Sequence, residues 1–288
     1  MLAPENPQLE PQPLNVEPET PVPAIAEPSP PLAPALPPPK AGENPVWSGW
    51  DMLQLTGLTL LLTLFIVPLL VILGAHSFAY PRESWLDVAR KPALALLSQL
   101  VAYIGVALYM ILLVQGKYHT RFWQALRWNW PGIGAASFLG LGVLMLGIDF
   151  LGKFLPLPKN TPFDQFFDRP FDAYLVAVFA VTLGPLMEEL FFRGFLYPVV
   201  ARRLGVIWAV LLTALLFGLT HFFQYGSSWG AVLIIFLVGV VLTAVRAMTK
   251  SVASSFLAHV GYNGTLMVIA ALQTDGFRHM EKAAVALF

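Results

Sequence analysis

The longest stretch of the chain without charged side chains, Leu204–Val245, reads LGVIWAVLLTALLFGLTHFFQYGSSWGAVLIIFLVGVVLTAV. Its 42 residues contain no Asp, Glu, Lys or Arg. A helix that crosses the hydrocarbon of a bilayer needs about 20 apolar residues, so the stretch is about twice the length of one span. The segment Gln224–Ser228 interrupts it with Gly and Ser residues that favour a turn. The sequence therefore predicts two membrane-spanning helices here, joined by a tight connection.

Five further spans are predicted from the positions where charged residues stop and start again. They lie at Asp51–Arg82, Lys91–Lys117, Arg127–Asp149, Asp172–Ala201 and Lys250–Asp275. The segment Asp172–Ala201 contains Glu188 and Glu189 but no turn signal between its ends, so we expect it to form one long helix. The alternation typical of β-barrels is absent. The fold class predicted from these segments is all-α, a polytopic membrane helix bundle with about seven transmembrane helices.

The composition agrees with a membrane protein and excludes several classes of function. Hydrophobic residues make up 57% of the chain and charged residues 12%, where a soluble domain has about 25% charged residues. The 17 Lys and Arg residues balance 17 Asp and Glu residues, so no basic field would attract nucleic acid. The chain has no cysteine, which excludes disulfides, thiol nucleophiles and thiolate metal sites. Any chemistry must use oxygen and nitrogen side chains.

Residues 1–44 differ sharply from the rest of the chain. They hold 14 of the 25 prolines and six glutamates, but no aromatic residue. Such a composition cannot bury enough apolar surface to offset the entropy of ordering. We expect a disordered, Pro-rich acidic tail that serves as a solvated tether, with a PxxP ligand for a partner module as the alternative. The predicted domains are this tail at 1–44, a transmembrane domain at 45–274 and a short C-terminal tail at 275–288.

Several residues are predicted at the membrane interface. The segment Asn160–Phe167 begins with a helix-start signal and continues with three Phe residues at helical spacing, which predicts a short helix lying in the interface. Tyr225, Trp229 and the pair Trp128 and Trp130 are typical of interfacial anchors. Asp149, near the end of the third span, is interpreted as an interface residue and not as part of a site. With seven spans, nine Lys and Arg residues lie on the side of the membrane that bears the N-terminal tail and eight on the other side. The positive-inside rule therefore does not decide the orientation.

Ionisable residues at membrane depth are the candidates for function, because a charge is costly in hydrocarbon. These residues, with one amide nearby, are Glu188, Glu189, Arg193, His221, His259 and Asn263. At about 1.5 Å of rise per residue, Glu188, His221 and Asn263 lie roughly 18 to 22 Å from the side of the membrane that bears the tail, and His259 roughly 12 Å. Side chains from separate helices thus converge in depth, which favours one shared polar chamber.

The spacing along the fourth span separates the two adjacent acids. Glu189 and Arg193 are four residues apart with the acid first, the favourable arrangement for an ion pair along one helix face, whereas Glu188 is rotated by about 100°. Taken alone, Glu188 could be a neutral acid hydrogen-bonded to a neighbouring helix. His259 and Asn263, also four apart, could be an ordinary hydrogen-bonded contact between helices.

Three motifs on three separate spans resemble a known family, the CAAX protease and bacteriocin-processing (CPBP) intramembrane proteases, which include the type II CAAX endopeptidases. The motifs are EExxxR at Glu188–Arg193, FxxxH at Phe217–His221 and HxxxN at His259–Asn263. The resemblance covers about residues 170–272 and departs from the family pattern at no motif position. Outside that range, the first three spans are similar only in being apolar.

The resemblance implies hydrolysis of a peptide bond within the membrane, and the residue types suit that reaction. Amide hydrolysis needs an activated water, a proton donor for the leaving nitrogen and donors for the developing oxyanion. We expect Glu188 to be the general base, His221 to help hold the water, and His259 with Asn263 to be the oxyanion donors. Glu189 and Arg193 would orient the helix. The implied substrate is a membrane-associated polypeptide, with prenylated CAAX-like tails as one class.

Metal chemistry is the alternative within this family, because two imidazoles and a carboxylate form a known zinc ligand set. Zinc would be bound by Glu188, His221 and His259. The two histidines lie on different helices without a compact HExxH pair, so we prefer a metal-free, glutamate-activated water and no cofactor. The motifs GxSG and GxGD of serine and aspartyl intramembrane proteases are not matched.

Two readings from other classes stay open. A membrane adaptor or regulator could keep the chamber for binding a partner, and a proton-coupled transporter could use Glu188 and His221 as a relay. The expected partners are the lipid bilayer and a peptide or protein substrate, without nucleic acid, and the oligomeric state is left open. We expect an integral multi-pass protein in the plasma membrane of a bacterial cell.

Overall fold

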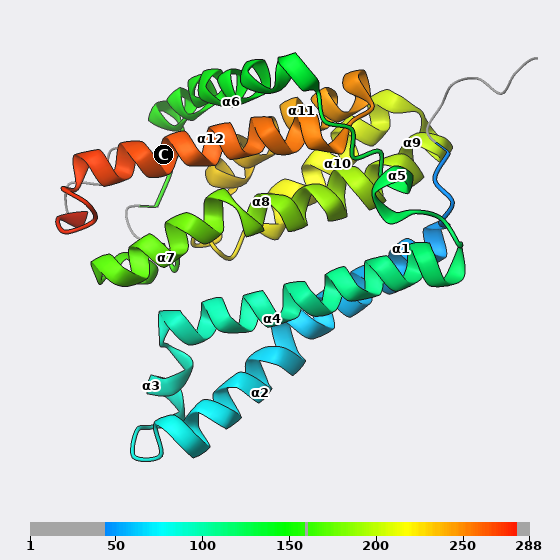
Figure 1. Ribbon diagram of the computed structural model, residues 1–288. Helices are drawn as coiled ribbons and strands as arrows, with labels where there is room; N and C mark the ends of the chain where they lie inside the picture. The colour runs from blue at the N-terminus through cyan, green and yellow to red at the C-terminus, as the bar shows by residue number, and fades with distance from the viewer. Residues whose placement is uncertain (1–43, 159–160, 281–288) are drawn as a thin grey trace, which may run out of the picture. The chain divides into compact units, whose positions relative to one another are not determined.

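The computed structural model describes residues 44–158 and 161–280, and all regular structure in these ranges is helical (Figure 1). The α-helices are α1 (Gly49–Leu61), α2 (Val67–Gly74), α3 (Trp85–Ala89), α4 (Pro92–Ile111), α5 (Phe122–Ala125), α6 (Ala135–Asp149), α7 (Pro170–Val181), α8 (Leu183–Glu188), α9 (Tyr197–Leu204), α10 (Val206–Thr220), α11 (Trp229–Thr249) and α12 (Val252–Gln273). The π-helical segments are η1 (Leu62–Ile66), η2 (Ala75–Ala79), η3 (Leu112–Lys117) and η7 (Glu189–Leu196), and the 3-10 segments are η4 (Gly132–Gly134), η5 (Phe150–Phe154) and η6 (Asp164–Phe167). The all-α prediction is confirmed. Of the predicted tails, residues 1–43 and 281–288 lie outside the described residues.

All seven predicted spans are present as apolar helical segments. Six are long enough to cross a membrane: Gly49–Ala79, Pro92–Lys117, Ala135–Phe154, Pro170–Leu204, Trp229–Thr249 and Val252–Gln273. The seventh, α10, is shorter, with 15 residues. The long uncharged stretch is divided as predicted, and α11 continues four residues past Val245. Arg246, the first of these four residues, is buried, and its guanidinium carbon lies 5.3 Å from the centre of the Tyr197 ring.

Local sequence signals explain where these helices begin. Ser48, Ser228 and Ser251 are the N-caps of α1, α11 and α12, and each side chain accepts a hydrogen bond from a backbone N–H of the first turn. Gly205 separates α9 from α10 with a φ of 82°, a conformation that residues with a Cβ rarely adopt. The α9–α10 turn therefore needs its glycine.

The fourth span runs from Pro170 to Leu204, longer than the predicted Asp172–Ala201 segment, and it is irregular at two places. Its backbone leaves helical geometry at Thr182, where φ is −115° and ψ is −77°. Pro185, three residues later, has no N–H to donate to the preceding turn. The second irregularity is η7, which begins directly after Glu188 and ends two residues before Pro198. Both irregularities flank the residue that the sequence places at the centre of the chamber.

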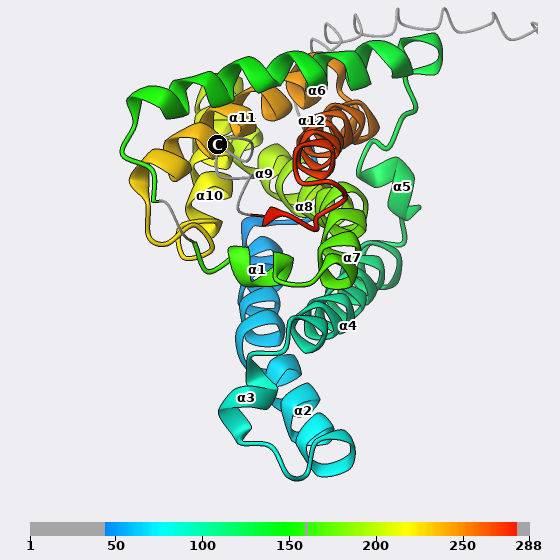
Figure 2. The same ribbon diagram turned by 90° about the vertical axis from the view of Figure 1, so that its left-hand side faces the viewer.

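The segment that carries the two acids, α8 followed by η7, lies inside the bundle. In Figures 1 and 2, α8 lies between α12 on one side and the pair α1 and α4 on the other. The helices α6 and α12 run side by side, and α10 packs against α11. A buried apolar cluster that includes Leu55, Met110 and Phe195 joins α1 and α4 to η7. Residues on η7 can therefore meet side chains from several spans.

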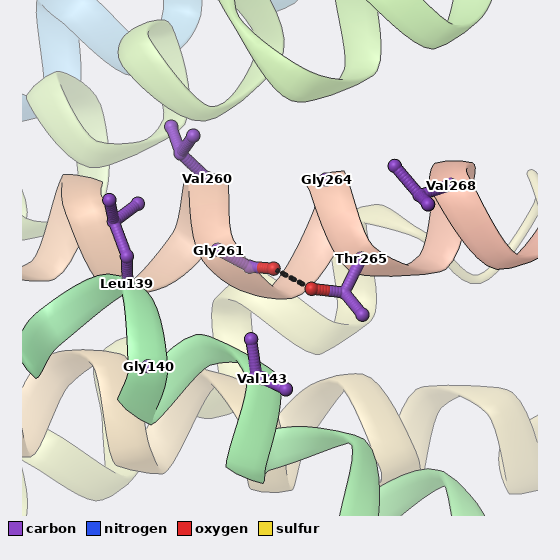
Figure 3. A pocket seen from close by; sticks show the side chains of 8 residues that line it. All are labelled: Leu139, Gly140, Val143, Val260, Gly261, Gly264, Thr265 and Val268. Atoms are coloured by element: carbon purple, nitrogen blue, oxygen red, sulfur yellow. Dashed lines mark hydrogen bonds between the residues drawn. The ribbon is translucent and has the colours of Figure 1, made fainter. Parts of the chain in front are cut away.

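Glycines allow α6 and α12 to approach unusually closely. A Cβ atom on Gly261 would lie 2.3 Å from the carbonyl oxygen of Leu139, and one on Gly142 would lie 2.2 Å from that of Ala258. Figure 3 shows the outer edge of this contact, a shallow groove where Thr265 donates a hydrogen bond to the carbonyl of Gly261. Such close packing of backbones is typical of small residues in membrane helices. It fixes the position of α12, which carries His259 and Asn263.

The predicted interfacial helix is a single turn of 3-10 helix, η6, and it packs on the bundle. Phe167 of this turn is buried, and its ring centre lies 5.9 Å from that of Phe277. Phe277 itself is buried against the ends of α7 and α12. Residues 275–280 of the predicted C-terminal tail therefore fold back onto the helices.

Candidate active site

The predicted ion pair between Glu189 and Arg193 is present and fully buried on η7. Nη1 of Arg193 lies 2.9 Å from Oε1 of Glu189, and neither side chain is exposed. The guanidinium also donates to Oγ1 of Thr243 and to the carbonyl of Gly239, both on α11. These bonds tie η7 to α11. A buried charge without such partners would destabilise the fold strongly.

Glu189 has two further partners, on α12. Its Oε1 lies 3.0 Å from Nδ1 of His259, and its Oε2 accepts a hydrogen bond from the hydroxyl of Ser255. The carboxylate only accepts, so Nδ1 of His259 carries the proton of this hydrogen bond. Glu189 therefore sets the orientation of the His259 ring as well as holding Arg193. The i, i+4 spacing predicted the Arg193 partner of Glu189 but not its contacts with His259 and Ser255.

Glu188 turns away from this buried pair and meets both histidines. Nε2 of His259 lies 3.7 Å from Oε2 of Glu188, and Nε2 of His221 lies 3.9 Å from its Oε1. The Glu188 side chain is 25% exposed, in contrast to Glu189. Both separations exceed a direct hydrogen bond, and a water molecule can bridge groups at such distances. The two adjacent acids thus have different surroundings, one accessible and one sealed.

His221 lies at the C-terminal cap of α10, and its ring is oriented by the same helix. Its Nδ1 lies 2.9 Å from the carbonyl oxygen of Phe217, four residues earlier. Because a carbonyl accepts only, Nδ1 donates this hydrogen bond and Nε2 is directed to Glu188. The FxxxH spacing therefore has a physical reason, since the carbonyl one turn back selects which nitrogen faces the acid.

Asn263 makes a contact between helices that the sequence left open. Its Nδ2 donates to the carbonyl oxygen of Ala180 at 2.8 Å. Ala180 lies two residues before the irregularity at Thr182, where a regular helical hydrogen-bond pattern ends. The side chain still has a second N–H and an acceptor oxygen. Asn263 is thus both a link to α7 and a pocket residue.

A pocket of about 910 Å³ connects these groups. Glu188, His221, His259 and Asn263 line it, whereas Glu189 and Arg193 do not. Most of the remaining wall is apolar, with hydroxyl and amide groups from α1, η1 and α4, among them Thr56, Thr59, Thr63, Gln99 and Tyr103. The predicted chamber therefore exists in the structure, and four of the six candidates open onto it.

Two pocket residues, Tyr225 and Asp149, were interpreted differently from the sequence. Tyr225, predicted to be an interfacial anchor, lines the pocket. Burial raises the pKa of the Tyr225 phenol above its usual range, and the negative charges of Glu188, Asp149 and Asp164 add to this shift. Asp149 also lines the pocket, which corrects its interpretation as an interface residue only. A carboxylate at a span end does not reveal from sequence which way it faces.

Ser255 and Thr243 are the supporting residues that the sequence analysis did not single out. Both are buried hydroxyls in apolar spans, and they bind Glu189 and Arg193 respectively. Ser255 lies four residues before His259, which places both on one face of α12. The four-residue spacing from His259 was the sequence signal that could have identified Ser255.

The donor groups do not converge as a metal site does. In residues 44–158 and 161–280, no three side chains of His, Cys, Asp or Glu are grouped so that they could hold a metal ion together. The two histidines approach different oxygens of Glu188, at 3.7 and 3.9 Å. The arrangement is suited to holding a small polar molecule between an acid and two imidazoles.

Comparison with known proteins identifies this part of the chain. The family model for type II CAAX prenyl endopeptidase Rce1-like proteins matches residues 170–265, about a third of the chain. No curated protein and no solved structure matches the chain. The match includes all three motifs and confirms the resemblance stated above. It supports a protease of the CAAX type, embedded in a membrane by several apolar helices.

Proposed function

We propose that this chain, which carries a type II CAAX prenyl endopeptidase Rce1-like region at residues 170–265, hydrolyses a peptide bond with a water molecule activated by Glu188. The observation that carries the proposal is the position of Glu188. Its carboxylate lies on the wall of the large pocket, within 4 Å of Nε2 of both His221 and His259. An acid at such a place can accept a proton from water and return it to a leaving group.

In the proposed reaction, the Glu188 carboxylate and the His221 ring hold the water. The water donates one hydrogen bond to Glu188 and one to Nε2 of His221, which is the acceptor nitrogen when Nδ1 donates to Phe217. As the water oxygen bonds to the carbonyl carbon, its proton passes to Glu188. The carbon–nitrogen bond then breaks, and Glu188 delivers the proton to the leaving amine.

His259 and Asn263 are proposed to stabilise the oxyanion. Because Nδ1 of His259 donates to Glu189, its Nε2 can donate to an oxyanion only when the ring is an imidazolium. The carboxylates of Glu188 and Glu189 both lie within 4 Å of nitrogen atoms of this ring. Asn263 supplies its second Nδ2–H. The structure thus adds a condition to the role that the motif implies for His259.

The proposed reaction is metal-free. The choice rests on the sequence pattern, because the two histidines come from different helices without a compact HExxH pair. The alternative remains zinc bound by Glu188, His221 and His259. The proposed substrate is a membrane-associated polypeptide, with prenylated CAAX-like tails as the class that the family name indicates.

The test is cleavage of a fluorogenic prenylated peptide by purified protein in detergent. Glu188→Gln keeps the shape and the hydrogen-bonding capacity of the side chain but removes the proton acceptor, so turnover should fall about 100-fold or more. Glu83→Gln is the matched control, because Glu83 lies on the connection between η2 and α3, outside the pocket. Both variants should keep the melting temperature of the parent. Undiminished turnover in Glu188→Gln would contradict the proposal that Glu188 activates the water.

A further inference from the structure

The charged groups that line the large pocket are unequal in sign. Three carboxylates line it, those of Asp149, Asp164 and Glu188, and no Lys or Arg does among the residues that the structure describes. The other side chains on the wall that can carry a positive charge are those of His221 and His259. Carboxylates that share one confined wall attract cations and repel anions, and an apolar wall weakens the screening of that field. The pocket therefore favours a positively charged group over a negatively charged one.

The three carboxylates differ in what already binds them. Glu188 faces the two histidines, and Asp164 accepts hydrogen bonds from the backbone N–H and the hydroxyl of Thr161. Asp149 has one occupied oxygen, because its Oδ1 accepts a hydrogen bond from the Tyr262 hydroxyl at 2.7 Å. Its Oδ2 is buried and has no hydrogen-bond partner among the described residues. Asp149 is thus the pocket carboxylate with capacity to bind something more.

The surroundings hold Asp149 in place. Asp149 is the last residue of α6, and Tyr262 lies on α12 directly before Asn263. The close contact of α6 with α12 fixes these two helices relative to each other. The nearest Lys along the chain, Lys153, has its Nζ 4.4 Å from the centre of the Phe150 ring. The carboxylate is therefore oriented by the helix that also carries the proposed oxyanion donors.

The field at Tyr225 shows that the three acids belong to one region. Besides burial, the negative charges of Glu188, Asp149 and Asp164 all raise the pKa of this phenol. Tyr225 lies on the connection between α10 and α11, four residues after His221. The carboxylates from α6, η6 and α8 thus act on the same side chain at the pocket wall.

We propose that Asp149 is a specificity-determining residue that binds a Lys or Arg side chain of the substrate segment in the pocket. The inference rests on the proposed protease function and names the chemistry of its substrate. The Asp149 carboxylate, which is part of the pocket wall, would accept a charge-assisted hydrogen bond from the ammonium or guanidinium group, and such a bond is stronger than one between neutral groups. The apolar wall would accommodate the neighbouring side chains. A substrate without a basic residue at that position would leave the carboxylate without this partner.

The experiment compares pairs of fluorogenic peptides that differ only in charge at one position. An otherwise apolar peptide carries arginine at each position in turn, and its partner carries citrulline, the neutral analogue of arginine. At one position, the arginine peptide should have a kcat/KM about tenfold or more above that of its citrulline partner. In Asp149→Asn this ratio should fall close to one. In Asp168→Asn, a variant of an exposed carboxylate that does not line the pocket, the ratio should equal that of the parent.

Because each ratio compares two peptides on the same protein, loss of folded protein cancels. A ratio near one at every position, or the same ratio in Asp149→Asn as in the parent, would overturn the inference. Peptide binding to the Glu188→Gln protein, measured by fluorescence anisotropy, separates this failure from failure of the protease proposal. Suppose that no peptide is cleaved, but that binding shows a preference for arginine that needs Asp149. The role of Asp149 in binding a basic side chain is then supported, and the proposed hydrolysis is contradicted.

Discussion

Oε1 of Glu189 lies 2.9 Å from Nη1 of Arg193 and 3.0 Å from Nδ1 of His259, so one buried oxygen joins the two motifs EExxxR and HxxxN. The ion pair links η7 to α11 through Arg193, and the imidazole links η7 to α12. Glu188, the next residue in the chain, is held at the pocket wall by this arrangement. The second acid of the motif therefore supports the first.

Replacing Glu189 with Gln should act on stability before it acts on chemistry. The variant leaves the Arg193 charge buried without its counterion, which costs about 3–5 kcal/mol when one partner of a buried pair is removed. We expect a clearly lower melting temperature in detergent than for Glu188→Gln. The His259 ring would also lose its carboxylate partner, so the folded fraction should turn over more slowly. Equal melting temperatures for the two variants would contradict the assignment of different roles.

Removing the amide of Asn263 should slow turnover. Asn263→Ala deletes one proposed oxyanion donor, and loss of such a donor typically lowers kcat by about 10² to 10³. The link to Ala180 is lost as well, so thermal unfolding has to be measured beside turnover. A loss of activity that only follows a loss of folded protein would assign Asn263 to the helix contact alone.

The close contact of α6 and α12 predicts that a single methyl group is not tolerated there. Gly261→Ala would place a Cβ 2.3 Å from a backbone carbonyl oxygen, so the two helices must separate. We expect a large fall in melting temperature and, because α12 moves, in activity. Gly140→Ala is the matched control on the facing helix, since nothing lies within 4 Å of its Cβ position. Similar unfolding temperatures for the two variants would show that the contact relaxes.

Metal content decides between the two chemistries. Under the metal-free proposal, active purified protein should contain no stoichiometric zinc by mass spectrometry and should keep its turnover after dialysis against a chelator. One zinc per chain, with activity lost on chelation and restored by zinc, would instead support the alternative with Glu188, His221 and His259 as ligands.

The seven apolar helices predict that the segment before α1 and the C-terminus face opposite sides of the membrane. This depends on α10, whose 15 residues span about 22 Å, less than the roughly 30 Å of a hydrocarbon core. Reporter domains fused after Asn44 and after Phe288 should therefore give opposite compartments. The same compartment for both would mean that α10 does not cross.

The features that could be predicted from the sequence are those that depend only on spacing along the chain. Charges are excluded from hydrocarbon wherever they occur, so the gaps between charged residues located seven helices, and the i, i+4 spacing predicted the pair of Glu189 and Arg193. The depth of Glu188, His221 and Asn263 along their spans also indicated one chamber. These inferences need only distances along the chain.

What only the tertiary structure decided is how the helices rotate and bend around their axes. Glu188 faces the pocket and Glu189 faces His259 in a segment that is irregular at Thr182 and in η7, and spacing along the chain did not predict His259 as a partner of Glu189. In the same way, the contact of α6 with α12 places Asp149 against Tyr262 and on the pocket wall. A side chain's position along a helix follows from the sequence, but its direction depends on packing between residues far apart in the chain.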